Sequence, residues 1–136
     1  MPEIRETATG MIAHGVRRVP VTLTLRTSSS NPLALLIDFY TNEGGEPNTW
    51  TMALELLQAA FGRHSGVIGE GDVIFNCASS RQEISIDLRS PEGTARVFIP
   101  RQVAQEFLSN TATIITEENT RAAIEDELER FLANCE

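Results

Sequence analysis

Residues 19–40, VPVTLTLRTSSSNPLALLIDFY, decide the fold class, because they contain two apolar runs separated by a turn. In the first run, apolar side chains at alternate positions from Val19 to Leu25 predict a strand with one apolar face. The Ser and Asn side chains before Pro32 can bond nearby backbone, which is typical of a turn. The second run, from Leu33 to Tyr40, is apolar on nearly both faces. Such a strand lies centrally in a sheet, or it buries its second face against a partner.

The rest of the first three quarters of the chain also favours strands. We expect them at residues 73–77, 84–88 and 95–99, and the sequence Ser90-Pro91-Glu92-Gly93 predicts a hairpin turn between the last two. Residues 49–52, around Trp50, fit either a strand or the start of a helix. A short helix follows, with Gly62 as its cap, and then a flexible glycine-containing stretch that ends at Asp72.

The last third of the sequence is helical. Pro100 is well placed to begin a helix, whose apolar stripe is Val103, Phe107 and Leu108. Thr116, followed by two Glu residues, predicts the N-cap of a final helix. The apolar stripe of that helix is Ile124, Leu128, Phe131, Leu132 and Cys135. We therefore expect one α+β, β-rich domain over residues 1–136, with antiparallel sheets, packed helices and a C-terminal amphipathic helix.

Composition and charge narrow the function classes. Hydrophobic residues make up 41% of the chain and charged residues 22%, which is ordinary for a globular domain. No apolar run reaches the roughly 18 residues that a membrane helix needs, and no secretory signal is evident, so we expect a cytoplasmic protein without membrane insertion. Nineteen acidic and 11 basic residues give a net charge of −8. Because nucleic acids and anionic membranes attract basic surfaces, this charge disfavours both as partners.

The sequence predicts neither an enzyme nor a metal or cofactor site. Every basic residue is Arg, which excludes Schiff-base and Walker-loop lysine chemistry. His14 and His64 are isolated, and no nucleophile-elbow or HExxH motif is present. Cys77 and Cys135 lie far apart without a CxxC pattern, which argues against a disulfide or zinc site. The acidic loop at residues 69–72 lacks a Lys and leads into a strand, so we interpret it as a plain loop rather than a phosphate cradle.

Four residues are candidates for contacts with other proteins: Tyr40, Trp50, Arg96 and Phe98. Tyr40 ends the strand that is apolar on both faces. Phe98 shares a face with Arg96, opposite the expected core side, and an exposed aromatic beside an Arg is typical of interfaces. The alternative is that Trp50 belongs to the core and that a helix covers Phe98.

Taken in order, several short landmarks resemble those of the SsgA-like sporulation and cell division proteins of actinobacteria. The resemblance runs from about Val21 to Leu132 and suggests an SsgB-like member. Its landmarks are Asn31-Pro32-Leu33-Ala34, Trp50 followed by Ala53-Leu54-Glu55-Leu56-Leu57, Gly69-Glu70-Gly71-Asp72-Val73, Ser90-Pro91-Glu92-Gly93, Phe107-Leu108 with Thr111, and the acidic last helix. Each is common alone, and their order and spacing carry the resemblance.

This resemblance implies a Whirly-like fold, a homotrimer and no enzymatic activity. It also implies a role in siting septa, by positioning the tubulin-like division protein FtsZ, with SsgA-like paralogues and other division proteins as further partners at the septum. A second hypothesis is a single-stranded nucleic-acid binder, because relatives of the Whirly-like fold include such proteins. The acidic balance of the chain argues against it.

Overall fold

The computed structural model describes residues 3–14, 16–40, 45–62, 67–76 and 82–133. These residues form one antiparallel sheet of eight strands, in the order β4-β3-β2-β1-β8-β7-β6-β5, with three helices. The strands are β1 (Glu3–His14), β2 (Arg17–Ser28), β3 (Asn31–Tyr40), β4 (Asn48–Ala53), β5 (Val67–Glu70), β6 (Val73–Asn76), β7 (Glu83–Ser90) and β8 (Gly93–Pro100). The helices are α1 (Leu54–Gly62), α2 (Arg101–Thr111) and α3 (Glu117–Ala133). The predicted α+β, β-rich class is confirmed.

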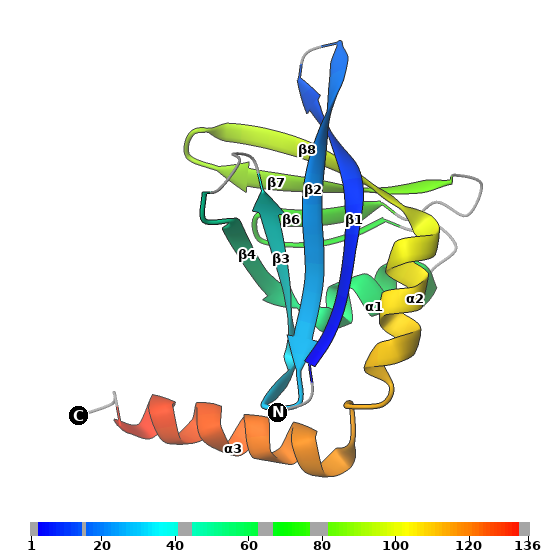
Figure 1. The fold of residues 1–136 in the computed structure, drawn as a ribbon. Coiled ribbons are helices and arrows are strands. Elements are labelled where there is room, and N and C mark those ends of the chain that lie inside the picture. The colour runs from blue at the N-terminus through cyan, green and yellow to red at the C-terminus, as the bar shows by residue number, and fades with distance from the viewer. Residues whose placement is uncertain (1–2, 15, 41–44, 63–66, 77–81, 134–136) are drawn as a thin grey trace.

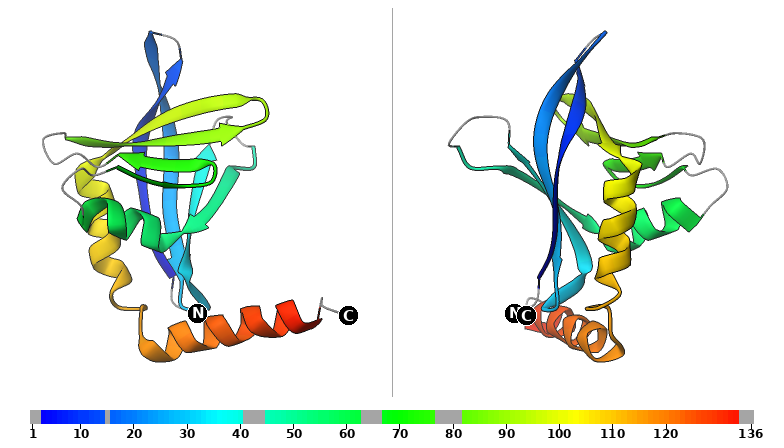
Figure 2. Two further views of the ribbon diagram at one scale, coloured as in Figure 1. Left: turned by 180° about the vertical axis from the view of Figure 1, so that it is seen from behind. Right: turned by 45° about the vertical axis from the view of Figure 1, so that its right-hand side comes forward.

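The sheet consists of two meanders that cross where β1 meets β8. This junction has only two residue pairs, Met11 with Phe98 and Ile12 with Val97. Figures 1 and 2 show that β5–β8 turn steeply across β1–β4, so that the sheet curls around its inner face. That face carries the core, together with one side of α1 and of α2. Fully buried core side chains include Leu23, Leu25, Leu35, Ile37, Leu57, Phe75, Ile84, Ile86, Val97, Ile99 and Phe107.

Gly10 allows the two meanders to approach closely. It is buried in β1 and lies opposite Val21 of β2. A Cβ atom at this position would lie 2.7 Å from Leu23 Cδ2 and 2.7 Å from the carbonyl oxygen of Phe98. Since no carbon atom tolerates a backbone oxygen at that distance, the crossing of β8 over β1 requires glycine here.

Several predicted elements are confirmed. The alternating run that starts at Val19 lies in β2, the run from Leu33 to Tyr40 is β3, and Ser90 pairs with Gly93 across the predicted hairpin turn. The segment around Trp50, which the sequence left open, is strand β4 and leads directly into α1. Pro100 is the N-cap residue of α2. Thr116 caps α3, because its Oγ1 accepts a hydrogen bond of 3.1 Å from the backbone N–H of Asn119.

Two predictions were incomplete or wrong. No pattern in residues 3–14 indicated strand β1, which pairs with β2 along its whole length. The glycine-containing stretch before Asp72 is not a simple flexible segment, because residues 67–70 form β5 and pair with β6. Gly71 has φ +60° in the intervening two-residue turn, as the first central position of a type II′ hairpin turn requires. His64 and both cysteines lie outside the described residues.

Candidate protein-interaction surfaces

Helix α3 exposes an apolar stripe. It lies across the end of the sheet where β2 ends and β3 begins, and it extends beyond the sheet edge (Figures 1 and 2). Ala123 is buried against the rest of the chain. The four large apolar side chains are exposed by 53% for Ile124, 54% for Leu128, 64% for Phe131 and 59% for Leu132. The helix and its stripe were therefore predicted correctly, but the chain's own core does not cover the stripe. Exposed apolar surfaces of this kind are typical of contact sites.

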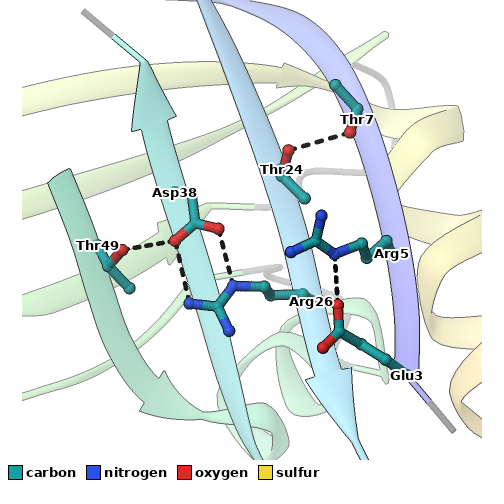
Figure 3. A network of polar contacts seen from close by, with 7 residues as sticks. All are labelled: Glu3, Arg5, Thr7, Thr24, Arg26, Asp38 and Thr49. Atoms are coloured by element: carbon teal, nitrogen blue, oxygen red, sulfur yellow. Dashed lines mark hydrogen bonds and ion pairs between the residues drawn. The ribbon is translucent and has the colours of Figure 1, made fainter. Parts of the chain in front are cut away.

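The outer face of β1–β4, opposite the core, holds a network around Asp38 (Figure 3). Arg26 donates from Nε to Asp38 Oδ2 at 2.7 Å and from Nη2 to Oδ1 at 3.3 Å. Thr49 Oγ1 donates to Asp38 Oδ1 at 2.5 Å. On the neighbouring strands, the hydroxyls of Thr7 and Thr24 lie 3.0 Å apart. The network thus ties β2, β3 and β4 together through side chains in addition to their backbone pairing.

The Asp38 carboxylate is ionised although its side chain is only 3% exposed. Burial opposes ionisation, but the hydrogen bonds from Arg26 and Thr49 outweigh it and hold the pKa of Asp38 below its usual 3.8. The hydrogen bond to Asp38 in turn raises the pKa of Arg26. Because each charge has its partner within the sheet, this polar face is satisfied without help from another protein.

A second set of paired charges lies on the outer face of β7 and β8. Arg96 donates to both carboxylate oxygens of Asp87, at 2.7 and 3.0 Å. These hydrogen bonds from Arg96 lower the pKa of Asp87. Arg18 places its guanidinium 3.7 Å from the ring centroid of Phe98 and donates to Glu83 at 2.8 Å. Arg18 of β2 therefore covers the Phe98 ring in a cation–π contact, whereas Arg96 is paired with Asp87.

Trp50 lies on the opposite, inner face. It pairs with Ile37 of β3, packs half-buried against the core and lines two surface hollows of about 330 and 350 Å³. Tyr40 is 37% exposed at the end of β3, on the outer face. The structure therefore does not bring the four predicted interaction residues into one patch. Trp50 is separated by the sheet from Tyr40, Arg96 and Phe98.

Sequence reasoning missed one other exposed apolar feature, the tip of the β1–β2 hairpin, which projects beyond the rest of the sheet (Figure 1). Val16 is fully exposed there and Val19 is 49% exposed. In the sequence this feature consists only of Val16 and Val19 on either side of two Arg residues. Such a short pattern also occurs at the end of an ordinary strand.

The described part of the chain shows neither a metal-binding cluster nor a membrane-spanning helix. No cluster of three or more His, Cys, Asp or Glu side chains in those ranges is arranged to hold a metal ion. None of the helices described above is long and apolar enough to cross a membrane.

Comparison with known proteins identifies the family. The model of the family described as "Streptomyces sporulation and cell division protein, SsgA" matches residues 20–120. The chain belongs to the SsgA family. Its relatives include the sporulation-specific cell division protein SsgB of Salinispora tropica, which is 31% identical over 113 residues, covering 81% of this chain and 77% of that protein. The SsgB protein of Saccharopolyspora erythraea is 32% identical over 133 residues, covering 95% of this chain and 92% of that protein.

Solved structures of SsgA-family proteins have the same fold. An SsgA-like sporulation-specific cell division protein from Thermobifida fusca superposes with a TM-score of 0.77 at 26% identity, covering 97% of this chain and 96% of that one. A second solved structure has a TM-score of 0.75 and 25% identity to this chain. It is described as "Mutations in SsgB correlate to longitudinal cell division during sporulation of Streptomyces coelicolor". It covers 90% of this chain and 95% of that one. The α+β fold is thus shared with proteins of sporulation and cell division.

The SsgA-family match covers some of the candidate surfaces and not others. Residues 20–120 include Arg26, Asp38, Trp50 and the β7–β8 hairpin. They exclude β1 and the exposed stripe of α3. The match to the family model therefore does not extend over the α3 stripe.

Proposed function

We propose that this chain is a non-enzymatic adaptor of cell division and sporulation. In this role it helps to site septa by positioning FtsZ, and it acts through contacts with proteins rather than through catalysis. Membership of the SsgA family supports the division role, and the names of the SsgB relatives support its link to sporulation. The absence of Lys and of a nucleophile motif in the sequence supports the non-enzymatic part of the proposal. The adaptor works in the cytoplasm at the septum, where SsgA-like paralogues are further partners.

The observation that carries the proposal is the exposed stripe of α3. Four large apolar side chains more than half exposed are costly in water, and each would gain about 1 kcal/mol if a partner covered it. We propose that other copies of the chain cover the stripe, forming a homotrimer. A trimer would present three copies of each remaining surface to a polymer, so that weak contacts are multiplied by avidity.

Co-sedimentation with FtsZ polymers from the same organism tests the adaptor role. We expect the wild-type chain to pellet with polymers formed in the presence of GTP and to stay in the supernatant without GTP. The double variant Leu128→Ser with Leu132→Ser should pellet less, because it loses avidity together with the trimer. Glu129→Gln, on the same helix, is the matched control and should pellet like the wild type. If the wild-type chain stays in the supernatant at every polymer concentration, recruitment of FtsZ by direct contact is wrong.

A further inference from the structure

The β4 edge of the sheet is flanked by two hollows. Strand β4 ends the order of the sheet, and among the described residues only its β3 edge is paired. The first hollow, of about 330 Å³, lies between β4 and the β7–β8 hairpin, whose tip lies beside the start of β4 in Figures 1 and 2. The second, of about 350 Å³, lies between β4 and the start of β6. Trp50 lines both hollows, so they adjoin at this residue, and the two together are called the β4 cleft.

The first hollow is apolar inside and acidic at its rim. Its inner side chains include Ile12, Phe39 and Val97, which belong to the inner face of the sheet. Glu92, on the hairpin turn, lies at its rim, and Asp72 lines the second hollow. Among the described lining residues of both hollows there are these two carboxylates and no Arg. The cleft therefore suits a ligand with an apolar side chain and positive charge.

The size and the strand edge favour a peptide over a small metabolite. A volume near 330 Å³ is at the lower end of the range of about 300–1,000 Å³ for ligand pockets, and it suits one large side chain. The outer edge of β4 has no partner strand in the part of the chain that the structure describes, so its backbone N–H and C=O groups can pair with an extended peptide.

We propose that this cleft binds an extended segment of a partner protein that adds to the β4 edge, places one bulky apolar side chain in the hollow beside Trp50 and carries Arg or Lys on either side of it. The inference deepens the adaptor role proposed above by stating the chemistry of the partner. Its test uses neither FtsZ nor the trimer, and none of the described residues that line the two hollows belongs to α3.

The single Trp of the chain reports on this site directly. The probes are three blocked peptides of about twelve residues, each with two Arg at both ends, alternating Val and Thr between them, and Leu, Ile or Phe at the centre. They are titrated to about 1 mM against the full chain while Trp50 emission is recorded. We expect a saturable change with at least one peptide. Binding should weaken in about 300 mM salt, because the charges at the rim are exposed.

Two altered peptides test the mode of binding. Replacing each terminal Arg by Glu should weaken binding at least about tenfold, because the rim is acidic. Methylating alternate backbone amides should have an effect of similar size, because it removes the donors that pair with β4. Equal binding of the basic and acidic peptides, or indifference to methylation, would show that the peptide does not add to this edge.

Substitutions in the protein locate the site. Ala95 is half-buried and lines the first hollow, so Ala95→Phe should fill it and abolish binding. Glu92→Gln and Asp72→Asn should each weaken binding by about two- to fivefold, as expected for exposed ion pairs. Glu129→Gln, which removes an acid on α3, is the matched control and should leave binding unchanged.

The following outcomes would contradict the proposal that the β4 cleft binds a peptide. If no peptide alters Trp50 emission at about 1 mM, the proposal is wrong. The same holds if Glu129→Gln weakens binding as much as Glu92→Gln, since attraction to the net negative charge would then explain it. If Ala95→Phe fails to fold, the two rim variants still decide. Because no FtsZ is present, peptide binding and FtsZ recruitment can succeed or fail separately.

Discussion

Asp38→Asn should destabilise the protein much more than the matched change Asp87→Asn. Both substitutions remove a carboxylate charge that accepts two hydrogen bonds from an Arg on a neighbouring strand. The pairs differ in exposure. The Arg26 and Asp38 side chains are 27% and 3% exposed, whereas those of Arg96 and Asp87 are 57% and 19% exposed. The two ion pairs therefore differ in burial, and Asp38 also accepts a hydrogen bond from Thr49.

The expected magnitudes follow from this difference. Removing one partner of a fully buried pair costs about 3–5 kcal/mol, because the other charge is left without compensation. Since Arg26 keeps about a quarter of its exposure, we expect Asp38→Asn to lower the free energy of unfolding by about 2–3 kcal/mol. For Asp87→Asn, water can solvate the released Arg96, so the loss should be at most about 1 kcal/mol.

Urea unfolding followed by Trp50 fluorescence and circular dichroism, at one fixed protein concentration, measures both losses. Two further variants, Arg26→Met alone and Arg26→Met combined with Asp38→Asn, test the cause. Arg26→Met combined with Asp38→Asn removes both charges, so it should cost less than the sum of the two single changes. If Asp38→Asn costs no more than Asp87→Asn, or if the two changes at Arg26 and Asp38 simply add, the network does not act as a buried charge pair.

Two more predictions concern acid stability and the strand crossing. Because the pKa of Asp38 is lower in the folded chain than its usual 3.8, its contribution to stability is fully present above that pH and is lost as the pH falls through the folded value. The stability gap between wild type and Asp38→Asn should thus be constant above about pH 5 and shrink below about pH 4 in urea titrations, and a gap that persists at low pH would contradict this origin. Gly10→Ala should lower the free energy of unfolding by about 1–3 kcal/mol or more, because its Cβ would strike Leu23 and the Phe98 carbonyl. Gly71→Ala has open space around its Cβ but φ +60°, so it should cost about 1–2 kcal/mol through backbone strain alone. A Gly10→Ala variant as stable as the wild type would mean that the strand crossing does not depend on Gly10.

Elements were predicted correctly where their own residues carry a clear alternating or helical pattern of apolar side chains. The alternation from Val19 to Leu25 reports one apolar face directly, and β2 follows from it. Strand β1 has no such signal, because its inward positions include Glu6, Ala8 and Gly10. Strand β5 contains a glycine and forms because it pairs with β6, which is information from outside the segment.

The candidate surfaces were less accessible to prediction. Periodicity indicated that α3 has an apolar stripe, but it does not indicate what covers the stripe. Arg26 and Asp38 are 12 positions apart and meet only because β2 and β3 pair in one register, with Asp38 opposite Thr24. Similarly, Trp50 lies beside the β7–β8 hairpin because the sheet curls, which no local pattern encodes.

Sedimentation velocity of the full chain tests most directly the claim that other copies of the chain cover the α3 stripe. We predict that the wild type and Glu129→Gln sediment with three times the chain mass of 15.0 kDa. The double variant Leu128→Ser with Leu132→Ser should sediment as a folded monomer, with an unchanged circular dichroism spectrum, because both side chains are more than half exposed in the single chain. A wild-type chain that stays monomeric at high concentration, or a double variant that remains trimeric, would contradict the account.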